Sequence, residues 1–238
     1  DSTDHVLFSA DAFGKFGTLD TNEEWLDEAR RYYIGIVGKY GVPVQKLLAK
    51  LSAWDIQTIC PLHGPVLREN LQYYIEKYNT WSLYQPEEEG ILIAYTSIYG
   101  NTKKAVMLLA DALAERGCKN VIVRDLARCD MTHVVAEAFK YSKLVLATTT
   151  YNVGIFPFMR EFISWLTERN YANRTIAFIE NGSWMPVAAQ LMQEKLKDSR
   201  EITFAQNNVK ILSALSGENI LQIEMLADEL CKRECEIM

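Results

Sequence analysis

Hydroxyl-bearing residues gather in segment 96–102, between a predicted buried strand and a predicted helix. Its residues are Thr96, Ser97, Ile98, Tyr99, Gly100, Asn101 and Thr102. Three hydroxyl groups and the backbone N–H groups at the start of a helix are suited to hold a phosphate. The segment contains no lysine and matches neither GxGxxG nor a Walker loop. It therefore favours a monophosphate that is not transferred, or else it is a capped turn without a ligand.

Two further polar segments follow predicted strands later in the chain. Segment 148–157 contributes the candidate ligands Thr149, Thr150, Tyr151, Asn152 and Gly154. Segment 180–186 contributes Asn181, Gly182, Ser183 and Trp184. Amide and backbone groups suit the edge of a planar ring, and the Tyr and Trp side chains suit its faces. The alternatives are a surface loop without a ligand and a tryptophan that shields the end of a sheet.

The elements that must position these segments alternate between strand and helix from residue 91 to residue 235. Strands are predicted at 91–95, 121–123, 144–147, 175–179 and 209–212, and helices at 101–116, 132–140, 157–169, 186–197 and 219–232. Apolar strands that alternate with helices indicate an α/β fold with a parallel sheet covered on both faces. Five such units fit the flavodoxin-like doubly wound strand order 2-1-3-4-5.

In such sheets, ligands bind beyond the carboxyl ends of the strands, at the switch point between strands 1 and 3. All three polar segments follow the carboxyl ends of predicted strands 1, 3 and 4. A phosphate loop, a polar edge and aromatic walls at one crevice describe a site for a flat heterocycle with a single phosphate. The sequence therefore predicts flavin mononucleotide (FMN) as the cofactor.

The N-terminal third is organised differently. Strands are predicted at 6–9 and 56–60, and helices at 23–39, 44–51 and 66–78. So few strands make a poor core for an independent domain. This part is either a small helical cap or the tail of a larger domain. A charged linker at 84–90 separates the predicted domains 1–85 and 90–235.

Composition and charge exclude several classes of protein. The 238 residues are 49% hydrophobic and 24% charged, which argues against a disordered chain, a collagen-like fibre or a coiled coil. Residues 1–89 hold 14 acids and 8 bases, whereas the remainder holds 17 of each. We expect no nucleic-acid partner, because no basic stripe is present.

Compartment is predicted from hydropathy and cysteine. No apolar run approaches the roughly 18 residues that span a bilayer, so we expect no membrane association. The polar, acidic start predicts no signal peptide. The five cysteines are an odd number without a CxxC pair. Free thiols in a reducing, cytoplasmic compartment are the interpretation that follows.

The stretch from Ile91 to Leu230 resembles the flavodoxin family, and segment 96–102 matches that family's phosphate loop. The segments Leu7-Phe8-Ser9-Ala10-Asp11-Ala12-Phe13-Gly14 and Pro61-Leu62-His63-Gly64-Pro65 resemble the end of a metallo-β-lactamase-like domain. That domain precedes the flavodoxin domain in flavodiiron proteins (A-type flavoproteins), in the order seen here. Segment 149–157 also resembles that family's flavin loop. The resemblance covers nearly the whole chain.

The resemblance implies a specific oxidoreductase activity. Flavodiiron proteins reduce dioxygen to water, nitric oxide to nitrous oxide, or both, at a non-haem di-iron centre. FMN passes electrons to the irons, and rubredoxin often supplies them. Family members are typically homodimers packed head to tail, so a homodimer or a higher homo-oligomer is expected.

The same resemblance implies two metal ligands in this chain. Asp11 falls on the family's bridging carboxylate, and His63 falls on its last histidine ligand. Carboxylates and imidazoles suit iron. The family's HxExDH-type cluster and one further histidine lie upstream of the bridging carboxylate. We therefore expect a di-iron site that is incomplete here, in the C-terminal portion of a longer flavodiiron protein.

Other functions stay open on the sequence alone. A stand-alone flavodoxin-like electron carrier would bind FMN and perform no substrate chemistry. An NAD(P)H:quinone reductase of the flavodoxin-like group would accept hydride from a nicotinamide. A phosphate-sensing domain would bind no flavin.

Overall fold

The computed structural model describes residues 1–17 and 24–232. The chain divides into two compact units, Asp1–Glu87 and Glu88–Met238. The division falls within the predicted linker 84–90. The assignment of the first unit to a metallo-β-lactamase-like domain stays a prediction.

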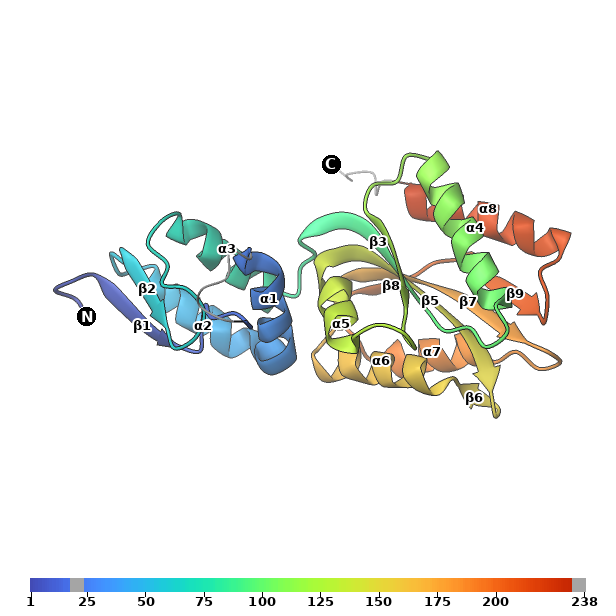
Figure 1. The fold of residues 1–238 in the computed structure, drawn as a ribbon, viewed down its shortest axis with the longest axis horizontal. Coiled ribbons are helices and arrows are strands. Elements are labelled where there is room, and N and C mark those ends of the chain that lie inside the picture. The colour runs from blue at the N-terminus through green and yellow to red at the C-terminus, as the bar shows by residue number, and fades with distance from the viewer. Residues whose placement is uncertain (18–23, 233–238) are drawn as a thin grey trace. The chain divides into compact units, whose positions relative to one another are not determined.

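The first unit pairs two short parallel strands with three α-helices (Figure 1). Its elements are β1 (Val6–Ala10), α1 (Trp25–Tyr32), a π-helical segment (Tyr33–Val37), a 3₁₀ turn (Gly38–Tyr40), α2 (Gly41–Leu51), β2 (Thr58–Pro61) and α3 (Leu71–Ser82). In the parallel pair of β1 and β2, Val6 lies opposite Thr58. Both predicted strands of this unit are therefore present.

All three helices of the first unit differ from the prediction, and α2 begins at Gly41 rather than Val44. The segment predicted as one helix at 23–39 is divided after Tyr32 into π and 3₁₀ turns, and its first residue, Glu23, lies outside the described residues. The helix predicted at 66–78 begins at Leu71. Its predicted first turn is not helical because Leu67 instead exchanges backbone hydrogen bonds of 2.8 and 2.9 Å with Ile59.

Aromatic side chains form the core of the first unit. The rings of Trp25 and Trp81 stack with centroids 5.8 Å apart. Phe13 packs 4.3 Å from the buried Tyr78, whose hydroxyl accepts a 2.6 Å hydrogen bond from the Phe13 N–H. The Trp25 indole N–H donates to the Phe13 carbonyl at 2.9 Å. These contacts fix the chain just after Asp11.

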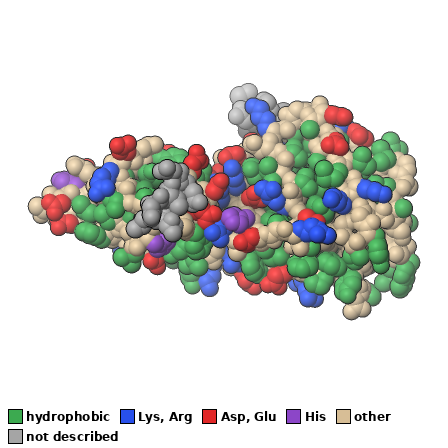
Figure 2. Space-filling view, in the orientation of Figure 1, with side chains coloured by type: hydrophobic (Ala, Val, Ile, Leu, Met, Phe, Trp, Pro, Cys, Tyr) green, Lys and Arg blue, Asp and Glu red, His purple; other side chains and the backbone are tan. Residues whose placement is uncertain are grey.

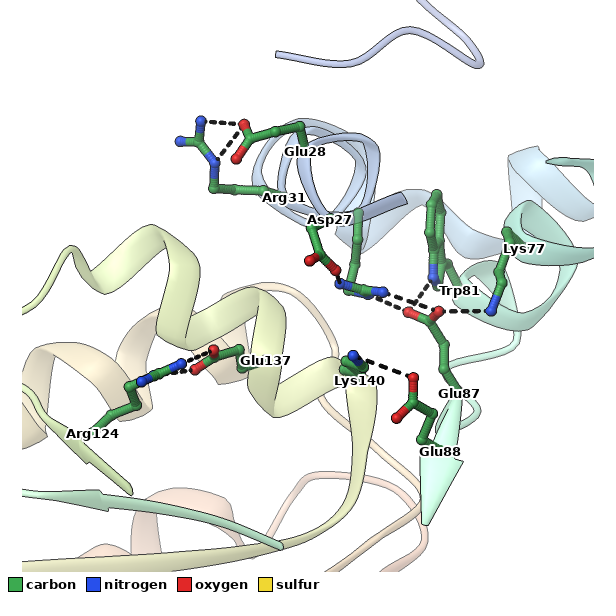
Figure 3. Close-up of polar contacts among 11 residues, drawn as sticks. Asp27, Glu28, Arg31, Lys77, Trp81, Glu87, Glu88, Arg124, Glu137 and Lys140 are labelled. Carbon is green, nitrogen blue, oxygen red and sulfur yellow. Dashed lines mark hydrogen bonds and ion pairs between the residues drawn. The ribbon is translucent and has the colours of Figure 1, made fainter. Parts of the chain in front are cut away.

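A buried ionic cluster ties the end of the first unit to its helices (Figure 3). The Glu87 carboxylate is fully buried and pairs with the Arg30 guanidinium, itself 2% exposed. Lys77 and the Trp81 indole N–H, both on α3, also contact this carboxylate, at 3.0 and 2.8 Å. Burial alone would raise the pKa of Glu87, but hydrogen bonds from Arg30, Lys77 and Trp81 lower it below its ordinary value.

The second unit is a parallel sheet covered by helices on both faces (Figure 1). Its elements are β3 (Glu88–Tyr95), α4 (Asn101–Glu115), β4 (Val121–Asp125), α5 (Met131–Lys140), β5 (Tyr141–Tyr151), β6 (Gly154–Ile155), α6 (Pro157–Glu168), β7 (Arg174–Gly182), α7 (Ala188–Leu196), β8 (Ile202–Phe204), β9 (Val209–Leu212) and α8 (Gly217–Cys231). Helices α4 and α8 cover one face, and α5, α6 and α7 cover the other.

The strand order β4-β3-β5-β7-β8 confirms the predicted order 2-1-3-4-5 and the flavodoxin-like fold class. The fifth position is shared, because both β8 and β9 pair with β7 in parallel. Only β9 was predicted. Strand β8 is short and half exposed, so it lacks the apolar run that marks a buried strand.

Three strands of the second unit extend further at their carboxyl ends than the sequence predicts, and β4 continues to Asp125. Strand β5 continues to Tyr151 and β7 to Gly182, because Thr148 and Thr149 pair in register with Glu180 and Asn181. Polar residues thus continue the ladder where a loop was expected. Helix α7 begins at Ala188 rather than Pro186, and α8 begins at Gly217 rather than Asn219.

The cysteines differ from the expectation that all of them are free thiols. Cys118 and Cys231 are joined by a disulfide, with Cα atoms 5.9 Å apart, whereas the sequence suggested free thiols. The two residues are 113 positions apart, so no short sequence motif predicts that they pair. Cys60 and Cys129 are free thiols, and Cys235 lies outside the described residues.

The surface agrees with the balanced charge of the second unit. Figure 2 shows Lys and Arg side chains interspersed with Asp and Glu over the face in view. Within the described part of the chain, no helix is both long and apolar enough to cross a bilayer.

Candidate functional site

The loop between β3 and α4 is folded by one serine. The Ser97 hydroxyl oxygen accepts hydrogen bonds from the backbone N–H groups of Gly100, at 3.1 Å, and Lys103, at 3.2 Å. Gly100 has φ +88° and ψ −10°, a left-handed conformation that glycine adopts without strain. The loop therefore turns sharply and delivers the chain into the first turn of α4.

Several donors of this loop lack a partner within residues 1–17 and 24–232. The Thr102 hydroxyl is buried and has no hydrogen-bond partner there. The backbone N–H groups of Ile98 and Tyr99 also lack an acceptor among the described residues. The first N–H groups of a helix have no partner within the helix, and its dipole favours an anion there. The donor set fits the phosphate of FMN.

The end of β5 supplies two threonines with different roles. The Thr149 hydroxyl is buried and has no partner among the described residues. The Thr150 hydroxyl accepts from the N–H groups of Val187, at 2.9 Å, and Ala188, at 3.2 Å, at the start of α7. Thr149 is therefore available to a ligand, whereas Thr150 positions the α7 segment.

A tight hairpin follows Thr150. Asn152 and Val153 both have positive φ, 50° and 57°, as a two-residue turn of type I′ requires. The turn joins β5 to β6, with Tyr151 opposite Gly154. Tyr151 is half exposed, and its ring meets that of Phe156 edge-on with centroids 5.3 Å apart.

The end of β7 combines a fixed amide with an exposed indole. The Asn181 side chain accepts from the Ser213 N–H at 3.1 Å and donates to the Ser213 carbonyl at 3.2 Å. Asn181 thus fixes the chain that follows β9. At Gly182, a Cβ atom would lie 2.9 Å from Pro186, so a larger residue would displace the turn that contains Ser183. Trp184 is 83% exposed, as suits a ring that stacks on a ligand.

The three segments meet at one edge of the sheet. They follow β3, β5 and β7, which are neighbours in the sheet, and the Thr96 and Thr148 hydroxyls share a 2.6 Å hydrogen bond across β3 and β5. Ser213 and Glu180 were not predicted as site residues. The buried Glu180 carboxylate accepts from the Ala189 N–H at 3.0 Å, near the start of α7. In the sequence, Glu180 could have been recognised as an acidic residue at the end of an apolar strand, whereas no feature of the sequence distinguished Ser213.

The predicted metal ligands of the first unit lie near each other. His63 Nδ1 is 2.9 Å from the Lys15 carbonyl oxygen, so Nδ1 carries the hydrogen. His63 Nε2 is buried without a hydrogen-bond partner among the described residues and lies 3.9 Å from the Asp11 carboxylate. A histidine that ligates a metal usually donates its other N–H to a carbonyl or carboxylate in this way. The orphaned Nε2 fits a metal.

Close packing holds the His63 ring in place. A Cβ atom at Gly14 would lie 2.4 Å from that ring, so a larger residue there would displace the His63 ring. The Tyr32 ring meets the His63 ring edge-on with centroids 4.5 Å apart. Burial and the nearby Asp11 carboxylate together raise the pKa of Tyr32. Among the described residues, no group of three or more His, Cys, Asp or Glu side chains could hold a metal ion.

Comparison with known protein families decides the assignment of the second unit. Residues 93–218, more than half of the chain, match the flavodoxin family model. The chain belongs to the flavodoxin family. Flavodoxin-family membership implies FMN, in agreement with the donors at the start of α4.

Relatives of this flavodoxin-family chain include flavodiiron proteins. It is 26% identical over 200 residues to an uncharacterised protein of Methanocaldococcus jannaschii, covering 81% of this chain and 50% of the relative. It is 24% identical to the anaerobic nitric oxide reductase flavorubredoxin of Escherichia coli, covering 82% of this chain and 43% of the relative. The chain spans about half the length of these relatives.

Solved structures show the same fold. Rubredoxin oxygen:oxidoreductase from Desulfovibrio gigas aligns with a TM-score of 0.87 at 20% identity, over 96% of this chain and 59% of its own. The flavodiiron protein of Giardia intestinalis aligns with the same TM-score at 18% identity, over 96% of this chain and 58% of its own. The predicted resemblance to flavodiiron proteins is confirmed.

Proposed function

We propose that this chain supplies the FMN-binding, electron-transferring part of a flavodiiron reductase of dioxygen or nitric oxide. The observation that carries the proposal is the set of unsatisfied donors at the start of α4, in a chain that matches the flavodoxin family. Relatives whose names state nitric oxide or oxygen reduction support the reaction class.

Individual residues have distinct roles in this proposal. Ser97 shapes the loop by accepting from the Gly100 N–H, while the Thr102 hydroxyl and the backbone N–H groups of Ile98 and Tyr99 bind the phosphate. The Thr149 hydroxyl and the backbone of the β5–β6 hairpin bind polar atoms of the ring. Tyr151, Trp184 and Tyr99 are exposed enough to cover the ring and exclude water. Bound FMN would supply one- and two-electron transfer, and these side chains would orient its ring.

Asp11 and His63 are proposed as two ligands of the di-iron centre. The Lys15 carbonyl holds His63 in the tautomer that leaves Nε2 as the metal-binding atom. Oxygen and imidazole ligands suit non-haem iron. The remaining ligands come from outside the residues that the structure describes. A rubredoxin-like electron donor and a head-to-tail homodimer belong to the same proposal.

The experiment that tests this function separates it from its rivals. The chain is loaded with FMN, reduced photochemically without oxygen, and then exposed to dioxygen or to nitric oxide with and without ferrous iron. In a parallel assay, the oxidised FMN-loaded chain is mixed with a donor protein or with NADH. We expect the donor protein, rather than NADH, to reduce the flavin. Rapid direct reduction by NADH would instead identify a quinone reductase. A chain that cannot bind FMN would contradict the proposal outright.

Ser97→Ala is expected to weaken FMN binding by roughly tenfold, because two backbone N–H groups lose their acceptor and the loop loses its shape. Quenching of FMN fluorescence during titration measures the dissociation constant. Ser164→Ala is the matched control, since the Ser164 hydroxyl donates to the Arg160 carbonyl within α6. Unchanged affinity in Ser97→Ala would remove Ser97 from the proposed phosphate loop.

His63→Gln is expected to weaken Co²⁺ binding at least tenfold, on the order of 1.4 kcal/mol, because Nε2 is one of two proposed ligands in this chain. The visible spectrum of bound Co²⁺ reports the affinity directly. His133→Gln is the control, because His133 is exposed on α5. Equal Co²⁺ affinity in the two variants would exclude His63 as a ligand.

A further inference from the structure

The C-terminal helix α8 is held mainly by its packing against α4. Leu226 and Leu230 of α8 are buried in the same apolar cluster as Leu113 of α4. At the surface, Arg116 pairs with Glu224 and Asp228, each at 2.7 Å. Both acidic side chains are close to half exposed or more, and exposed ion pairs contribute little to stability. These two ion pairs therefore contribute little to holding α8 in place.

A covalent bond joins the two helices at the same end. Cys118 follows Gly117, whose positive φ of 74° marks the end of α4, and Cys231 is the last residue of α8. Their Cα separation of 5.9 Å lies in the range typical of disulfides. Both residues are partly buried against the apolar cluster, so one side of the pair stays open to solvent.

We propose that Cys118 and Cys231 form a reversible redox clamp that fastens α8 to α4 when the surrounding thiol pool is oxidised. The reaction partner is a low-molecular-weight thiol and its disulfide, of the glutathione class. In the closing reaction, the small disulfide is reduced to two thiols and takes up the two thiol protons. One sulfur–sulfur bond breaks in the small molecule and one forms between Cys118 and Cys231.

The position of the bond makes it an effective clamp. It links residues 113 positions apart, and the enclosed segment runs from β4 to the last turn of α8. A disulfide that closes so long a loop restricts the unfolded chain strongly. Opening the bond leaves α8 with its apolar packing, the exposed ion pairs, and the hydrogen bonds that Glu229 accepts from Gln206 and Asn207. The proposal concerns α4 and α8 alone and does not depend on FMN binding.

Peptide mapping tests the pairing. The full chain is equilibrated with oxidised glutathione, alkylated and digested with trypsin without reduction. We expect a linked pair of peptides, 117–119 and 211–232, that separates on reduction. A linkage that involves Cys235 or Cys60, or five alkylated cysteines after oxidation, would overturn the proposal.

Urea unfolding, monitored by circular dichroism, tests the effect of the disulfide on folding stability. We expect oxidation to raise the unfolding midpoint by on the order of 1 M urea, and dithiothreitol to reverse the rise. The double variant Cys118→Ser/Cys231→Ser is expected to have the low midpoint under both conditions. Cys60→Ser/Cys129→Ser is the matched control that should keep the response. Equal unfolding midpoints in oxidised and reduced wild-type protein would contradict the clamp.

Discussion

Glu87→Ala is expected to destabilise the first unit by about 3–5 kcal/mol, because it leaves the buried Arg30 guanidinium without its main counter-charge. Arg30 keeps Asp27, at 2.6 Å, but that carboxylate is 76% exposed and cannot replace a fully buried partner. Lys77 and the Trp81 indole also lose their acceptor. Hydrogen–deuterium exchange of peptides from α1 and α3 measures the loss.

The neighbouring acids provide matched controls for this substitution. Glu89 is 82% exposed and lies 3.8 Å from Lys143, whereas Glu88 lies 3.2 Å from Lys140 (Figure 3). Exposed pairs of this kind contribute roughly 0–1 kcal/mol, so Glu89→Ala should be almost neutral. Equal exchange rates in Glu87→Ala and Glu89→Ala would show that the cluster does not stabilise the first unit.

The same cluster predicts the direction of acid sensitivity. The pKa of Glu87 is lowered from its ordinary value of 4.5, so its stabilisation is fully present above that value. The stabilisation is lost as the pH falls through the lower, folded-state pKa. Wild-type protein should therefore lose stability more steeply below pH 4.5 than Glu87→Gln does. Parallel pH profiles of the two proteins would contradict this.

Gly100→Val is expected to abolish FMN binding at micromolar concentration. A β-branched residue at φ +88° costs about 1–3 kcal/mol, so the loop must change its conformation and move the donors that are proposed to bind the phosphate. The added Cβ meets no atom within 4 Å, so the effect arises from the backbone and not from a clash within the chain. Flavin fluorescence titration measures the loss.

Helix α4 itself supplies the control for that substitution. Gly117 lies at its other end, also with positive φ, and a Cβ atom there also meets nothing within 4 Å. Gly117→Val should therefore cost similar folding stability while leaving FMN affinity unchanged. Stoichiometric flavin in purified Gly100→Val would exclude the phosphate-loop assignment.

The sequence predicts the second unit better than the first for a physical reason. Buried parallel strands such as β3 and β7 appear as apolar runs between helices, so the parallel sheet covered by helices follows from the alternation. Extensions at strand ends were missed because Thr149 and Asn181 pair through backbone groups that hydropathy does not register. In the first unit, the bridge between Ile59 and Leu67 displaced the start of α3, and such a contact has no local signal.

In the candidate site, too, the sequence predicts some residues, whereas the roles of others depend on tertiary contacts. Residue types alone marked Ser97, Gly100 and Trp184, because hydroxyl groups, glycine and exposed aromatics have recognisable uses at strand ends. The roles of Thr150 and Asn181 as positioning residues required the tertiary structure. The Cys118–Cys231 pair depends on the packing of α8 against α4, which no spacing rule predicts.

One measurement tests the central claim most directly. The purified chain is reconstituted with FMN, freed of excess flavin, and analysed for flavin absorbance and for iron in the same sample. The account predicts about one FMN per chain and little iron, because Asp11 and His63 alone hold it weakly. A colourless protein after reconstitution would contradict the flavin site, and about two tightly bound irons per chain would contradict the incomplete metal site.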